Sequence, residues 1–86
     1  MPKVSEFFGI SIYFYYRDHH PPHFHAIYGS AQAAIAIDDL ALLEGRLPPR
    51  ALGMVMEWAD AHRAELERAW QQARERLPLD LIEPLK

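Results

Sequence analysis

Four of the five histidines lie within seven residues, at His19, His20, His23 and His25. On an extended strand, side chains two positions apart project from the same face, with Cα atoms about 7 Å apart. His23 and His25 can therefore converge on one divalent metal ion, with His20 or Asp18 completing the set, and imidazole suits zinc, nickel, copper and iron. The predicted metal ligands are His23, His25 and His20. In the alternative interpretation the rings are structural and bind only carbonyls or water.

A second chemistry open to these residues is metal-free cleavage of RNA. Histidine can act as a general acid or base near neutral pH, while arginine holds a phosphate. The candidate catalytic residues are His23, His25, His62 and Arg17. The other residues that could edge such a site are Arg46, Arg50 and Tyr15. The composition argues against this interpretation. The chain has 9 Lys and Arg but 12 Asp and Glu, and a net charge of −3 disfavours simple coating of nucleic acid.

The histidines must be positioned by the β-rich first half of the chain. Aromatic and β-branched residues predict a strand over residues 9–17. Prolines 21 and 22 end it, and further strands are expected over residues 23–28, 31–37 and 40–43. The intervening turns are short, at residues 29–30 and 38–39. Spacings this tight favour an antiparallel meander, because parallel pairing needs long crossovers.

The second half of the chain predicts helix over residues 49–77, starting near Pro49 and ending before Pro78. A straight helix of that length would measure about 43 Å, against a radius of gyration of about 12 Å for such a domain. A break is expected at residues 60–62, with Asp60 as a new N-cap. His62 falls on the apolar face and could meet the side of the sheet that carries His23 and His25.

The expected fold is therefore α+β, with a three- to four-stranded antiparallel meander sheet packed against a long or broken C-terminal helix. Residues 1–86 should form a single domain, with the sheet over about 5–45, the helical region over about 49–77 and an apolar tail over 78–86. The predicted core residues are Ile10, Ile12, Phe14, Ile35, Ile37, Val55, Ala59, Leu66 and Trp70. The two tryptophans are expected in the core.

Composition excludes several classes of protein. The chain has no cysteine, so disulfides and thiolate metal sites are ruled out. Its longest aliphatic run, residues 33–37, is far too short for a membrane span, and no signal peptide is visible at the start. A cytoplasmic location and no membrane partner are therefore expected.

One pattern runs through most of the chain: His-His-Pro-Pro-His-Phe-His-Ala at residues 19–26, Tyr-Gly at 28–29, and segments at 5–10, 44–51, 57–66 and 70. In this pattern the chain resembles a bacterial family, the domain of unknown function 4160. Where such families commonly have Asn before the two prolines, this chain has His20, which weakens an essential role for that residue. The resemblance implies no established substrate. Some members are described as toxins of toxin–antitoxin pairs, and members are often encoded beside another small protein.

The residues and the resemblance leave two hypotheses for the function. In the first, the chain is the toxin-like member of a toxin–antitoxin pair, acts on RNA or translation, and has a small protein partner. The alternative is a non-catalytic module that binds a protein partner and whose histidines are structural or hold a metal. Homo-oligomer formation is compatible with either, and no cofactor other than a divalent metal is expected.

Overall fold

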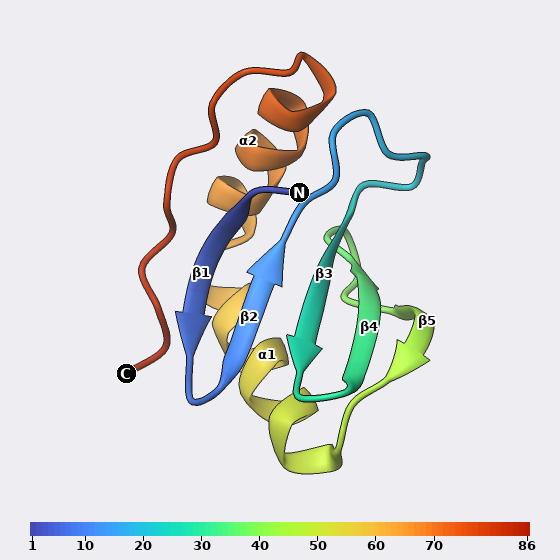
Figure 1. The fold of residues 1–86 in the computed structure, drawn as a ribbon, viewed down its shortest axis with the longest axis vertical. Helices are drawn as coiled ribbons and strands as arrows, with labels where there is room; N and C mark the ends of the chain where they lie inside the picture. Colours follow the sequence, from blue (N-terminus) through green and yellow to red (C-terminus); the bar gives the residue numbers. More distant parts are fainter.

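Five antiparallel strands form one sheet in the computed structural model, which describes residues 1–86 (Figure 1). The strands are β1 (Lys3–Phe7), β2 (Ile10–Tyr13), β3 (His23–Tyr28), β4 (Ala31–Ala36) and β5 (Leu42–Arg46). Strands adjacent in sequence are adjacent in the sheet, which confirms the meander. Two helices, α1 (Pro49–Ala61) and α2 (Arg63–Arg74), follow and lie behind the sheet in Figure 1. The α+β class is confirmed.

The predicted number of strands, three to four, was wrong because β1 was missed. Its pattern does not alternate cleanly: Val4 and Ser5 are both buried, at a shift in the register against β2. The link to β2 is the two-residue turn Phe8–Gly9, with φ of 50° and 80°. Positive φ at both turn positions matches the twist of a tight hairpin. The strand expected over residues 9–17 therefore begins after this turn and stops at Tyr13.

The helical region breaks where the sequence indicated. Pro49 is the first residue of α1, and His62 separates α1 from α2. Asp60 was wrong as an N-cap: no side chain caps α2, and Asp60 instead accepts a hydrogen bond from Arg63 at 3.1 Å. The helix also ends at Arg74, earlier than residue 77, because Arg76 adopts a left-handed φ of 58°. Neither helix is long and apolar enough to span a membrane.

The core lies between the sheet and the helices. All nine predicted core residues are buried, each with at most 1% of its surface exposed. Trp58 sits at the centre, with its ring centroid 5.2 Å from that of Phe7 and 6.0 Å from that of Phe24. Trp58 therefore joins α1 to strands β1 and β3.

The C-terminal segment packs along β1 on the body of the protein (Figure 1). The backbone N–H of Ile82 donates to the carbonyl of Val4 at 2.8 Å, and the indole N–H of Trp58 donates to the carbonyl of Glu83 at 2.7 Å. Ile82 is buried, whereas Leu81 is exposed. The segment partly covers the free edge of β1, which an exposed edge strand would otherwise present to other chains.

Gly45 in β5 is a position where only glycine fits. Its φ is +72°, and a Cβ there would overlap the carbonyl oxygen of Gln32 on β4. We expect Gly45→Ala to lower the free energy of unfolding by about 2 kcal/mol or more, because a left-handed residue costs about 1–2 kcal/mol before any clash. Urea denaturation measures the change. The matched control is Gly53→Ala in α1, where space is open and the protein should gain up to about 1 kcal/mol. Equal losses in both variants would contradict this account of β5.

Candidate metal centre

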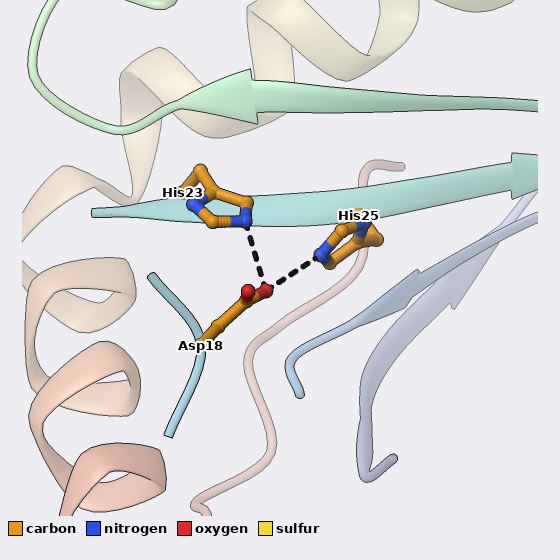
Figure 2. A group of neighbouring side chains, drawn as sticks. All are labelled: Asp18, His23 and His25. Carbon is orange, nitrogen blue, oxygen red and sulfur yellow. Dashed lines mark hydrogen bonds and ion pairs between the residues drawn. The ribbon is translucent and has the colours of Figure 1, made fainter. Parts of the chain in front are cut away.

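The first and third residues of β3 are histidines, and their side chains share one face of the strand. His23 and His25 project to one side of β3 (Figure 2). Phe24 between them is buried in the core and packs against Trp58. Asp18 reaches the two rings from the segment that joins β2 to β3 (Figure 2). The two prolines at 21 and 22 are in this segment, and the carbonyl of Pro22 accepts from the N–H of Ile37 at 3.0 Å. That bond fixes the loop to the end of β4.

Three potential ligand atoms converge at this point. Oδ2 of Asp18 lies 2.9 Å from Nε2 of His23 and 3.0 Å from Nε2 of His25. All three atoms are within 4.8 Å of one another. The side chain of His23 is 1% exposed, that of Asp18 12% and that of His25 14%. The cluster therefore lies just beneath the surface, within reach of solvent on the His25 side.

The hydrogen bonds of His23 define the chemistry of the cluster. Its Nδ1 lies 2.7 Å from the carbonyl oxygen of Pro21. Because a carbonyl only accepts, Nδ1 carries a proton and donates it. Nε2 of the same ring then faces Asp18 with either a lone pair or a second proton. A lone pair would oppose a carboxylate oxygen at 2.9 Å. A cation between the two atoms, a metal ion or a shared proton, would remove this conflict.

Asp18 is held as a carboxylate. Burial acts to raise its pKa, but the hydrogen bond from His25, the bond from the backbone N–H of His19 and the charges of His23 and His25 outweigh it. The net effect is a lowered pKa. An ionised oxygen facing two imidazoles is an electrostatic arrangement that also favours a bound cation.

The lowered pKa of Asp18 predicts a pH dependence of stability. A group whose pKa is depressed by folding stabilises the protein above its unfolded value, here 3.8, and that stabilisation is lost as the pH falls through the folded pKa. In chelator, wild type should be more stable than Asp18→Asn at pH 6, and the gap should narrow below pH 3.8. Urea midpoints measured from pH 6 downward test this; a gap that widens on acidification would contradict it.

Aromatic rings surround both imidazoles. His23 packs against Trp70 of α2, with ring centroids 5.3 Å apart, and His25 stacks on Tyr15 at 4.0 Å. The rings of His23 and His25 are 5.0 Å apart and nearly perpendicular. These contacts restrict the rotation of each ring. The two Nε2 atoms are therefore oriented before any ion binds, which lowers the entropic cost of binding.

A shallow hollow lies beside His25 on the open face of the sheet. Tyr15 and His25 form one wall, and Glu44 of β5 lies two strands away, opposite Ala34. Ala34 on β4 is the register partner of His25 on β3, and its small side chain leaves space at the base of the hollow. A small molecule can therefore approach the cluster from this side.

The structure places the other candidate residues elsewhere. His20 packs edge-on to Trp70, at 5.7 Å, and is not one of the three converging ligands; Asp18 takes that position. The structure does not place His62 among the ligand atoms that converge at His23 and His25. His62 packs on Trp58, which contacts Phe24 on the core side of β3, and its Nδ1 donates to Glu65 at 2.7 Å.

The predicted arginines also separate. Arg17 adjoins Asp18 but lines a different hollow, with residues from the end of α2. Arg46 and Arg50 lie near the junction between β5 and α1, at the other end of the sheet from the β2–β3 segment (Figure 1). They do not join the histidines, whereas Tyr15 does. From the sequence spacing, Asp18 was only an alternative to His20 as the third ligand. The bend of the loop decides which of the two side chains faces the strand.

Comparison with known proteins gives the family. The model of the domain of unknown function DUF4160 matches residues 9–71, most of the chain. The chain belongs to the DUF4160 family. Searches of curated proteins and of solved structures gave no match. The residues matched by the DUF4160 model include Asp18, His23 and His25. The C-terminal segment packed along β1 lies outside the match.

Proposed function

We propose that this chain is a mononuclear metal-binding protein in which Asp18, His23 and His25 hold one divalent transition-metal ion of the zinc class. One observation carries the proposal: both Nε2 atoms are directed at Oδ2 of Asp18 while Nδ1 of His23 donates to Pro21. Histidines that bind metals usually donate their other ring N–H to a carbonyl or carboxylate, which fixes the tautomer. Two imidazoles and one carboxylate are a common ligand set for zinc and for non-haem iron.

The distances within the cluster suit such an ion. Zinc ligands at about 2.0–2.2 Å from the metal stand about 3.3–3.5 Å from one another in a tetrahedral site. The N···O separations of 2.9 and 3.0 Å are those of atoms in direct contact. A small outward movement of the Asp18 side chain, about 0.4 Å, would open the space. The two Nε2 atoms lie within 4.8 Å of each other and would have to reach the same spacing of about 3.5 Å, so small adjustments of the two histidine side chains would accompany this movement.

Three protein ligands leave a coordination position for water or a substrate, as in catalytic zinc sites. A bound ion would supply Lewis acidity at that position. The hollow beside His25 gives the approach, and Glu44 adds a hydrogen-bond acceptor across it. The rings of Tyr15 and Trp70 keep the two imidazoles in place.

Calorimetric titration of chelator-treated protein with zinc tests the proposal. Wild type should bind one ion per chain, and zinc should raise the melting temperature. For His25→Ala we expect an affinity loss greater than ~100-fold, because even the loss of an outer-shell partner costs up to about that much. His62→Ala is the matched control, since His62 also bonds a carboxylate but lies outside the cluster. Absence of binding in wild type, or equal binding by His25→Ala, would overturn the proposal.

A second candidate function is the binding of a small protein partner, including a role in a toxin–antitoxin pair. The observation that favours it is β5, an edge strand exposed along its whole length, with Leu42 and Leu43 about two-fifths exposed at 45% and 39%. Such an edge can accept a strand from another chain. Expression with and without the neighbouring gene product tests it: growth arrest relieved by the partner, and co-purification weakened by Leu43→Lys, would support it. Unchanged growth and no co-purification would exclude it.

A further inference from the structure

Three arginines gather where the β2–β3 segment meets the end of α2. Arg17, Arg74 and Arg76, with Glu75, line one hollow that has no apolar residue. All three are exposed, and they are one-third of the nine Lys and Arg in a chain of net charge −3. Positive charge is therefore concentrated at one place on an otherwise acidic protein.

One carbonyl holds the two segments together. The carbonyl of Ala73 accepts from the backbone N–H of Arg17 at 3.3 Å and from that of Arg76 at 3.2 Å. Arg17 and Arg76 both adopt left-handed backbones, with φ of 55° and 58°. Such conformations are uncommon for residues other than glycine and persist only where the surrounding structure maintains them. The fold therefore fixes the two arginines beside each other.

No carboxylate lies within ion-pair distance of these guanidinium groups, although Glu75 is adjacent in sequence. Arg74 donates to the backbone carbonyl of Asp18 at 3.2 Å and lies over the ring of Trp70 at 5.9 Å. Arginine near a helix C-terminus stabilises the helix dipole. That explanation fits Arg74 and Arg76 but leaves out Arg17, which comes from a segment far away in the sequence.

We propose that this arginine cluster, Arg17, Arg74 and Arg76, binds a phosphate group. The planar fork of a guanidinium matches phosphate oxygens with paired, charge-assisted hydrogen bonds. Three positive charges and one negative charge line the hollow, so its net charge suits a phosphate dianion or a phosphodiester. Either a free phosphate or the backbone of RNA can supply this group. The bond from Arg74 to Asp18 places the bound phosphate next to the candidate metal centre, but binding does not depend on a metal.

Titration followed by the arginine side-chain NMR signals tests the inference, in chelator so that metal binding plays no part. One arm adds inorganic phosphate, a second adds a short single-stranded RNA, and sodium chloride of equal ionic strength is the control. The Nε–H signals of Arg17, Arg74 and Arg76 should shift with phosphate and not with chloride. Arg17→Gln should weaken binding at least ~5-fold, in line with one charge-assisted bond pair. Arg68→Gln, an exposed position on α2, should leave it unchanged.

A charge variant of the hollow gives a second test of phosphate binding. Glu75→Gln should strengthen the binding, because it removes the one negative charge from the hollow. Shifts with phosphate and RNA alike assign the site to nucleic acid, whereas shifts with phosphate alone assign it to a free phosphate or a small phosphorylated molecule. Shifts that chloride reproduces, or equal affinities for wild type and Arg17→Gln, would overturn the proposal and leave the arginines as partners of the helix end. Failure of zinc binding would not affect this result.

Discussion

Replacing His23 by alanine should abolish the proposed metal binding and lower the stability of the protein. His23 is buried, bonded through Nδ1 to Pro21 and through Nε2 to Asp18, and packed on Trp70. Its removal leaves a cavity and a partly buried carboxylate without its main partner. Leaving a buried polar group without its partner costs about 1–3 kcal/mol, and the cavity adds to this, so we expect a loss of about 3 kcal/mol in the free energy of unfolding.

Comparison with His25→Ala separates the ligand role of His23 from its structural role. Both variants should lose zinc binding, but His25 is more exposed and has no bonded carbonyl, so its loss should cost about 1 kcal/mol. His19→Ala is the control, because the side chain of His19 is 73% exposed and lies no nearer than 3.7 Å to Oδ1 of Asp18, so its removal should change both properties far less than the loss of His23. Urea denaturation in chelator, paired with zinc calorimetry, measures both. A His23→Ala protein that is as stable as His19→Ala would contradict the proposed geometry.

The largest effect on stability is expected from Trp58→Ala. The indole is fully buried, contacts Phe7 and Phe24, and bonds the carbonyl of Glu83. Truncation of a buried tryptophan costs about 3–5 kcal/mol. A domain of this size has a total stability of only about 4–13 kcal/mol. We therefore expect a melting temperature lowered by about 15 °C or more.

Trp58→Phe distinguishes packing from the anchoring of the C-terminal segment. It keeps a ring in the core but removes the donor to Glu83, so it should lose less stability than Trp58→Ala. It should also speed amide exchange at Ile82, whose N–H bonds to Val4. Leu81→Ala, at a position that is 79% exposed, is the control for the segment and should behave as wild type. Equal melting temperatures for Trp58→Ala and Leu81→Ala would contradict the assigned core.

Local patterns predicted the elements whose ends are marked by strong signals. The strand at His23–Tyr28 is bounded by prolines and by Gly29, and the structure has the same bounds. Pro49 marks the start of α1 because proline is favoured in a first helical turn. Burial followed from periodicity, since alternate residues of a strand and every third or fourth residue of a helix face the core.

Elements whose ends depend on long-range contacts could not be predicted in this way. β1 is paired only with β2 and with the C-terminal segment, and its register shift hides the alternation of side chains. β5 runs through Gly45, which as a local signal indicates a turn and in the sheet allows a close approach to Gln32. The choice of Asp18 rather than His20 beside the two rings depends on how the loop is fixed to β4 and α2.

Anomalous diffraction from a crystal soaked in zinc tests the account most directly. We expect one strong anomalous peak per chain, bonded to Nε2 of His23, Nε2 of His25 and Oδ2 of Asp18 at about 2.0–2.2 Å. The bond from Nδ1 of His23 to Pro21 should be retained, because it fixes the ring that presents Nε2 to the ion. Zinc found only at the exposed His19 or His20, with Asp18 still bonded directly to both rings, would contradict the account.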